Sequence, residues 1–404
     1  MDYTELSDDL QISLQSQKEK FDKSLILNPV ENIPDQEFLF PCTSFLHGLY
    51  GSDSIKTKNE KQNTKILFSH RDAVSKDLNK IYKTWADLLK ADTLSMRLLS
   101  GLHAHIIIFM SLANPGDKIL LLPEIAGGHM STAKILARLG LDVVDFIIDE
   151  NKHCINIEES KKLIERIQPD FIFVDRSEGL YYEDFSWLSE YKASVKIFDA
   201  SQYLTNIIAR DYKNPFDMGF DFVLSTLHKN LPGPQRALVC ARKQNLLWQK
   251  LKQNMSLYVS NMHVFTIYSA GLMLKDWPSL KRLSKNMLEN VMLLEKELSK
   301  TDLRVLLRDT KLMQTHHLWL QFEKKENAFD FYLDMERCGF LVNYRLLPYN
   351  LGYGIRIGTS AATYSGLRPS HIENLAKFIS IIHKKGYSRS LSKEIEEFIK
   401  TIKK

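Results

Sequence analysis

Between residues 118 and 241 the chain carries six short apolar runs that are separated by amphipathic stretches. The runs are KILLL (118–122), DVVDFII (142–148), FIFV (171–174), VKIFD (195–199), DFVLS (221–225) and RALVCA (236–241). Helical periodicity occupies much of the sequence between them, at 129–139, 157–167 and 183–192. Strands without polar alternation that are separated by helices are typical of a largely parallel sheet covered on both faces. The sequence therefore predicts an α/β fold.

The order of elements changes after residue 270, and this divides the chain. We predict an N-terminal arm over residues 1–40, a large α/β domain over 41–275 and a smaller α+β domain over 276–404. A chain of 404 residues is long enough for two or three domains. The polar, turn-rich segment 51–65 is expected to be a mobile loop.

Composition excludes several classes of protein. The chain has 54 Lys and Arg against 49 Asp and Glu, and the two signs are well mixed, so a nucleic-acid partner is not indicated. The four cysteines form no CxxC pair, so no metal site and no disulfide framework is predicted. The N-terminus does not resemble a signal peptide, and no apolar run is long enough to span a membrane. We expect a cytoplasmic protein without a membrane partner.

Polar side chains follow the predicted strands at the points where they end. They are Asp199, Ser177, Thr226, His228, Lys229 and His129, and Ser100-Gly101 opens the predicted helix SGLHAHIII. The carboxyl ends of parallel strands form the ligand-binding edge of such a sheet, and a helix N-terminus favours a phosphate. Pyridoxal 5'-phosphate needs a lysine for its aldehyde, an acid beside its ring nitrogen and a phosphate site.

Each of these residues also has an ordinary structural interpretation. Asp199 could be a turn or N-cap residue, Lys229 a surface lysine, and His129 a hydrogen-bonded histidine in a first helical turn. Many helices begin with Ser-Gly. The joint arrangement is what favours pyridoxal phosphate over these separate interpretations.

Several segments resemble the motifs of the serine hydroxymethyltransferase family and occur in that family's order. STLHKNLPGPQ (225–235) resembles Thr-Thr-Thr-His-Lys-Thr-Leu-x-Gly-Pro-Arg, and FDASQ (198–202) resembles Val-Asp-x-Ala-His. GGHMSTA (127–133) is similar to Gly-Gly-His-Leu, SGLHAH (100–105) to Ser-Gly-Ser-x-Ala-Asn, and GIRIGTSAAT (354–363) to Gly-Ile-Arg-Ile-Gly-Thr-Pro-Ala-Xaa-Thr. The lysine, aspartate and arginine motifs together make the resemblance specific.

The resemblance implies a fold-type-I pyridoxal-phosphate enzyme, with a mostly parallel sheet of the seven-stranded type in the large domain, working as a homodimer with a shared active site. By the same resemblance, Lys229 bonds the coenzyme aldehyde, Asp199 pairs with the ring nitrogen and His129 stacks on the ring. The remaining coenzyme contacts it implies are Ser100, Gly101 and Leu102 at the phosphate, and Ser177, Gln202, Thr226 and His228 around the ring. Arg356 would bind the carboxylate of an amino-acid substrate as a two-pronged fork, the alternative being a surface charge at a strand edge.

The departures from the family pattern concern the substrate side. In FLHGLYG (45–51), His47 stands in place of the glutamate that the family uses with tetrahydrofolate, and Phe45 replaces a tyrosine. Gln202 replaces a histidine, Gln235 an arginine and Val30 a serine. His47 could still move protons, or it could be a loop histidine without a role.

These departures predict a specialised member that makes or breaks the Cα–Cβ bond of a β-hydroxy amino acid, with an aldehyde as the second substrate or product. We expect a folate-independent aldolase or transaldolase. The alternatives are a serine hydroxymethyltransferase that uses tetrahydrofolate, an aminotransferase on the same fold, and a regulatory protein without catalysis.

Overall fold

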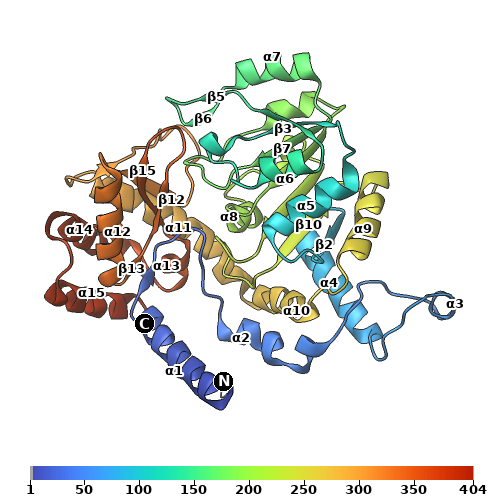
Figure 1. Cartoon of the computed structure of the whole chain (residues 1–404), viewed down its shortest axis with the longest axis horizontal. Helices are drawn as coiled ribbons and strands as arrows, with labels where there is room; N and C mark the ends of the chain where they lie inside the picture. The colour runs from blue at the N-terminus through green and yellow to red at the C-terminus, as the bar shows by residue number, and fades with distance from the viewer. Residues whose placement is uncertain (1–2, 404) are drawn as a thin grey trace. The chain divides into compact units, whose positions relative to one another are not determined.

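The computed structural model describes residues 3–403 of the chain, which form two compact units (Figure 1). The large unit comprises Asn32–Lys285 and Thr310–Thr315. The small unit comprises Met1–Glu31, Asn286–Asp309 and His316–Lys404. Among the described residues, no helix has the length and apolar character that crossing a membrane requires.

A sheet of seven strands forms the centre of the large unit, in the order β2-β10-β9-β8-β7-β3-β4. The strands are β2 (Thr93–Ser95), β3 (Lys118–Leu121), β4 (Asp142–Asp145), β7 (Phe171–Asp175), β8 (Val195–Asp199), β9 (Phe222–Thr226) and β10 (Ala237–Ala241). The five strands from β4 to β9 are parallel, and β10 runs antiparallel to both β9 and β2. The predicted fold class, with its mostly parallel seven-stranded sheet, is confirmed.

The helices of the large unit include α4 (Asp72–Leu89), α5 (Gly101–Leu112), α6 (Thr132–Arg138), α7 (Ile157–Ile167), α8 (Leu204–Ala209), α9 (Leu246–Tyr258) and α10 (Val264–Leu272). Several of them bury apolar side chains against the sheet. Ile108 of α5 and Trp248 of α9 share one apolar cluster with Phe173 and Leu224 of the strands. Each such side chain contributes about 1.5–3 kcal/mol on burial. This packing fixes where the strands end, and therefore where the polar residues after them lie.

The small unit contains an antiparallel sheet of order β11-β12-β15-β14 and a separate parallel pair of β1 and β13. Its strands are β1 (Leu25–Ile26), β11 (Arg304–Val305), β12 (His317–Gln321), β13 (Phe340–Leu341), β14 (Asn343–Leu346) and β15 (Tyr353–Gly358). Its helices include α1 (Tyr3–Asp22), α12 (Lys325–Arg337), α13 (Ser360–Tyr364), α14 (Pro369–Lys385) and α15 (Arg389–Ile402), while α11 (Trp277–Leu298) begins before residue 286. Leu25 and Leu27 after α1 belong to the apolar core of this unit.

Three local expectations are wrong. Residues 183–192 form the short 3-10 helix η4 (Ser186–Glu190) instead of an α-helix. The run 142–148 is divided between β4 and β5 (Ile148–Asp149), which pairs with β6 (Cys154–Ile155). Residues 58–62 of the expected loop form helix α3 (Lys58–Gln62), because Thr57 and Glu60 each accept a hydrogen bond from the other's backbone N–H and so cap its first turn.

The turn after β3 requires glycine. Gly127 has φ of +87°, and a Cβ atom there would lie 1.7 Å from the carbonyl oxygen of Glu178. The N–H of Glu178 in turn donates to the carbonyl of Gly127 at 2.9 Å. The turn that leads to His129 is therefore held directly against the segment that follows β7.

We predict that Gly127→Ala lowers the free energy of unfolding by more than Gly116→Ala does. Gly116 has a similar φ of +90° but open space around it, so its replacement costs only the left-handed backbone, about 1–2 kcal/mol. Gly127→Ala adds a backbone clash to that cost. Urea unfolding of the full chain, followed by tryptophan fluorescence, measures both variants. Equal losses would contradict the contact between the two segments.

Candidate active site

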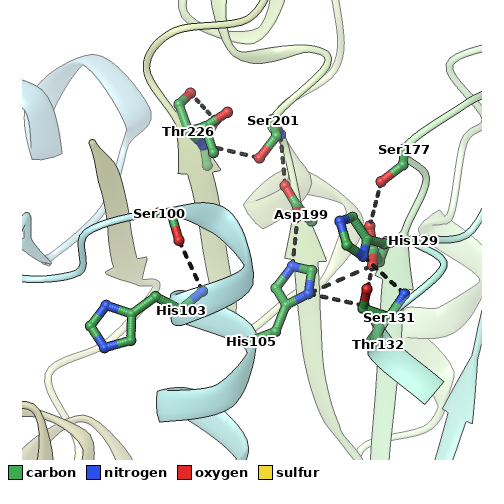
Figure 2. Close-up of polar contacts among 12 residues, drawn as sticks. Ser100, His103, His105, His129, Ser131, Thr132, Ser177, Asp199, Ser201 and Thr226 are labelled. Carbon is green, nitrogen blue, oxygen red and sulfur yellow. Dashed lines mark hydrogen bonds and ion pairs between the residues drawn. The ribbon is translucent and has the colours of Figure 1, made fainter. Parts of the chain in front are cut away.

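Four parallel strands bring their following residues to one edge of the sheet. In the register of the sheet, Asp199 at the end of β8 lies beside Asp175 of β7 on one side and Leu224 of β9 on the other. Figure 2 shows the resulting cluster, with Ser177 and His129 on one side of Asp199 and Thr226 on the other. The structure thus places these sequence-predicted residues together.

Asp199 is the buried acid of this cluster. Only 7% of the residue is exposed, and its Oδ1 accepts a hydrogen bond from the backbone N–H of Ser201 at 2.8 Å. Its Oδ2 lies 2.8 Å from Nε2 of His105. Burial raises the pKa of Asp199, but the hydrogen bond and charge of His105, the charge of Lys229 and the Ser201 contact together hold it below its usual range. The carboxylate is therefore ionised, as pairing with a protonated ring nitrogen requires.

Lys229 follows β9 on a segment that is anchored on both sides. Its carbonyl oxygen accepts a hydrogen bond from the side chain of Asn32 at 3.0 Å. The next residue, Asn230, is buried and donates to the side chain of Asn206 at 2.8 Å. Burial and the neighbouring charge of Lys229 lower the pKa of His228 to about 4, so that imidazole is neutral. The charge of the half-buried amine also lowers the pKa of Asp199.

Helix α5 begins beside the end of β9. Ser100 caps the helix by accepting a hydrogen bond from the N–H of His103 at 3.2 Å. A Cβ atom on Gly101 would lie 3.0 Å from Cγ2 of Thr226, so the start of the helix touches the strand that precedes Lys229. The first N–H groups of a helix have no partner within it and attract anions. A phosphate at this helix start would meet the N–H groups of Gly101 and Leu102.

Several polar atoms in this cluster fit a polar ligand. Within residues 3–403, the buried Oγ1 of Thr226, Nδ1 of His228 and both side-chain polar atoms of Gln202 find no hydrogen-bond partner. Buried polar atoms are normally hydrogen-bonded, so their concentration at one sheet edge favours a ligand that bonds them. An ionised acid, a lysine, a helix N-terminus and these atoms together fit pyridoxal phosphate.

His129 and Ser177 complete the side of the cluster nearest β7. Burial lowers the pKa of His129, and its Nδ1 accepts a hydrogen bond from the N–H of Ser131 at 3.2 Å. The side chain of Ser177 donates to Asp175 at 3.3 Å. A neutral imidazole is suited to packing against a flat ring, which agrees with the role expected for His129.

Arg356 belongs to the small unit. It lies on β15, which pairs with both β12 and β14, and only 1% of the residue is exposed. The alternative interpretation as a surface charge at a strand edge is therefore wrong. In the register of the sheet, Trp319 and Asn343 lie opposite it on the two flanking strands.

His47 lies on the short 3-10 helix η2 (Phe45–Gly48) and is exposed. Its ring stacks on Phe265 with centroids 4.6 Å apart, and His263 stacks on the same phenyl ring at 5.6 Å. In the part of the chain that the structure describes, no hydrogen bond or ion pair joins His47 to the strand-end cluster. The structure therefore places His47 in an aromatic stack apart from those contacts.

Sequence reasoning missed His105 and Asp175. His105 lies on α5 and is 1% exposed, between the carboxylates of Asp199 and Asp175. Asp175 directly follows the run FIFV, so its place at a strand end was a usable signal. Periodicity does not single out His105, because α5 is apolar on most of its surface. Its place opposite the asparagine of the motif Ser-Gly-Ser-x-Ala-Asn was the usable signal.

Comparison with known proteins agrees with this geometry. The family model described as serine hydroxymethyltransferase matches residues 14–379. The chain belongs to the serine hydroxymethyltransferase family. The serine hydroxymethyltransferase of Aeropyrum pernix is 26% identical over 330 residues, which cover 78% of this chain and 75% of that protein. That of Archaeoglobus fulgidus is 25% identical over 335 residues, which cover 78% and 76%.

A solved structure shares the fold. The crystal structure of L-threonine transaldolase from Pseudomonas fluorescens, in the internal aldimine state, has a TM-score of 0.90. It is 19% identical and the match covers 99% of this chain and 92% of that one. Membership of the serine hydroxymethyltransferase family and this fold identify a pyridoxal-phosphate-dependent enzyme of the serine hydroxymethyltransferase type, with aldol-type chemistry on an amino acid.

We predict that Lys229→Ala abolishes the covalent link to pyridoxal phosphate. The purified wild-type enzyme should be yellow, and borohydride should fix the coenzyme on the peptide that contains Lys229, as mass spectrometry would detect. Lys243→Ala is the matched control, because Lys243 is an exposed lysine that follows strand β10. A modified peptide without Lys229, or an unchanged spectrum in Lys229→Ala, would contradict the assignment.

Proposed function

We propose that this enzyme makes or breaks the Cα–Cβ bond of a β-hydroxy amino acid without folate, as an aldolase or a transaldolase of a biosynthetic pathway. The observation that carries the proposal is the substitution at position 47. A glutamic acid that serves folate-dependent transfer in the family is replaced here by His47, whose ring is stacked on Phe265. A stacked imidazole cannot reproduce the hydrogen bonds that a carboxylic acid makes to a folate.

The transaldolase of known structure supports the same proposal. It shares this chain's fold over 99% of the length, and its name denotes exchange of the aldehyde part of threonine. Such a reaction needs coenzyme chemistry at Cα and a second aldehyde, but no one-carbon carrier. The strand-end cluster, which would serve the coenzyme, is retained, whereas position 47, which serves folate in the family, is altered. Both observations agree with a reaction that needs the coenzyme but no one-carbon carrier.

The roles of the chain's own residues follow from their chemistry. Pyridoxal phosphate, when bound, would supply the electron sink for the bond that breaks at Cα of an amino acid. Asp199 would hold the proton of the ring nitrogen, and His129 would cover one face of the ring. Gly101 and Leu102 would bind the phosphate through their N–H groups. Thr226, His228 and Gln202 offer polar atoms that orient the ring.

Arg356 would orient the substrate through its carboxylate. A guanidinium binds a carboxylate with two parallel hydrogen bonds, which fixes the direction of the bonds to Cα. In the retro-aldol direction the Cα–Cβ bond breaks, the β-hydroxyl loses its proton and the β-carbon leaves as an aldehyde. In a homodimer with a shared active site, His47 on the exposed surface of one subunit would be available to accept that proton in the other.

A folate-dependent serine hydroxymethyltransferase is the second candidate, because the curated relatives carry that name. The two candidates differ in their response to tetrahydrofolate. The first requires none, while the second transfers the one-carbon unit of serine to it.

We predict that threonine yields acetaldehyde at a rate that tetrahydrofolate changes by less than about twofold, since no folate takes part in the bond cleavage. An alcohol dehydrogenase that oxidises NADH reports the acetaldehyde, and serine with and without tetrahydrofolate is run in parallel. Strong stimulation by the folate with serine would favour the second candidate. Conversion of the coenzyme to its amine form without aldehyde release would instead indicate an aminotransferase.

We predict that Arg356→Lys raises the KM for the amino acid by about 10- to 100-fold, because one of two charged hydrogen bonds is lost. The spectrum of the bound coenzyme should stay unchanged. Arg389→Lys, at an exposed arginine of α15, is the control and should leave the KM as it is. An unaltered KM in Arg356→Lys and in Arg356→Ala would remove Arg356 from the substrate site.

A further inference from the structure

A buried chain of hydrogen bonds starts at Asp199 and runs over residues from four different elements (Figure 2). Nε2 of His105 on α5 lies 2.8 Å from Oδ2 of Asp199 on β8. Nδ1 of the same ring lies 3.0 Å from Oγ1 of Thr132 on α6. The Thr132 hydroxyl donates to Oδ2 of Asp175 on β7 at 2.9 Å. Asp175, Thr132 and His105 are each no more than 1% exposed.

The donors and acceptors in this chain determine the protonation of His105. A hydroxyl has one proton, and Thr132 gives it to Asp175, so Thr132 can only accept from Nδ1 of His105. An ionised carboxylate only accepts, so Nε2 must donate to Asp199. Both ring nitrogens therefore carry a proton, and His105 is an imidazolium.

Asp175, His105 and Asp199 together carry one net negative charge, which is available to the coenzyme. Asp175 lies 3.7 Å from Nδ1 of His105 and balances its positive charge. Asp199 then keeps its own charge while His105 and the N–H of Ser201 hold its two oxygens. A carboxylate bound at both oxygens cannot rotate freely. The corresponding position in the family motif Ser-Gly-Ser-x-Ala-Asn is an uncharged asparagine, so this chain departs from that motif at the residue that holds Asp199.

We propose that His105, held as a cation between Asp175 and Asp199, is a positioning residue that keeps the Asp199 carboxylate ionised and in one orientation toward the ring nitrogen of pyridoxal phosphate. The inference rests on the coenzyme role proposed above for Asp199. Under this proposal helix α5 serves the coenzyme in two places. Its first N–H groups bind the phosphate, and His105 acts on the ring nitrogen through Asp199.

The surroundings of His105 support a persistent charge. Burial lowers the pKa of His105, but the charge of Asp175 and the hydrogen bond and charge of Asp199 raise it above its usual range in spite of Lys229. The groups around the ring are Asp175, Asp199, Thr132, His129 and, edge-on at 5.0 Å, Phe173, and the charge of Lys229 also acts on it. Because the folded pKa is raised, the stability that the charge contributes is complete below about pH 6.5. It is lost as the pH rises through the folded pKa.

The test uses the enzyme loaded with pyridoxal phosphate that carries 15N in its ring, because the NMR shift of that nitrogen reports its protonation directly. His105→Phe fills the space without a donor, His105→Asn restores the family residue with one donor and no charge, and Thr132→Val cuts the link to Asp175. His383→Asn, at an exposed histidine of the small unit, is the matched control.

We expect the pH at which the ring nitrogen is half protonated to fall by at least one unit in His105→Phe, equal to a tenfold weaker hold on the proton. His105→Asn and Thr132→Val should shift in the same direction by less, and His383→Asn should not shift. The dissociation constant for pyridoxal phosphate should rise about tenfold in His105→Phe, and kcat should fall more than KM changes.

Identical ring-nitrogen titrations in the wild type, His105→Asn and Thr132→Val would overturn the proposal, even if activity fell, because a merely structural role leaves that signal alone. His105→Asn keeps a polar side chain and Thr132→Val keeps the shape of threonine. Both therefore test the proposal even if His105→Phe does not fold. Asp199→Asn tests the role of Asp199 at the ring nitrogen separately from the positioning role of His105. If Asp199→Asn leaves the ring-nitrogen titration unchanged, the role of Asp199 itself is wrong.

Discussion

The site of this enzyme depends on one buried carboxylate and the positive charges that stabilise it. Taking Asp199 out of water favours its neutral form, which could not hold a proton on a ring nitrogen. His105 on α5 and Lys229 on the segment after β9 reverse that preference, because both lower the pKa of Asp199. The remaining parts of the large unit, from the Gly127 turn to the cap at Ser100, bring the other groups into reach of this carboxylate.

The sequence permits much of this to be predicted, for a physical reason. Strands buried on both faces leave uninterrupted apolar runs, and their ends mark the sheet edge, so Asp199, Thr226 and Lys229 could be found as strand-end residues. The first part of the motif GIRIGTSAAT (354–363) lies on β15. The three-residue strand β2 left no such run and was not predicted.

What could not be predicted depends on contacts between distant segments. The partners of His105 are 27 and 94 residues away along the chain, and nothing in the local pattern of α5 announces them. The cap of α3 is local and its Thr57–Glu60 spacing was readable, but the polar composition of the segment obscured it. The stack of His47 on Phe265 joins residues more than 200 positions apart, so its geometry needed the fold.

The contact between Gly101 and Thr226 has a consequence for attempts to reshape this pocket. Since a methyl group at position 101 would already press on Cγ2 of residue 226, a larger side chain at 101 requires residue 226 to shift or to become smaller. A mutant library that varies them one at a time would discard combinations that succeed only as a pair. The two codons are best randomised jointly, as a single design unit.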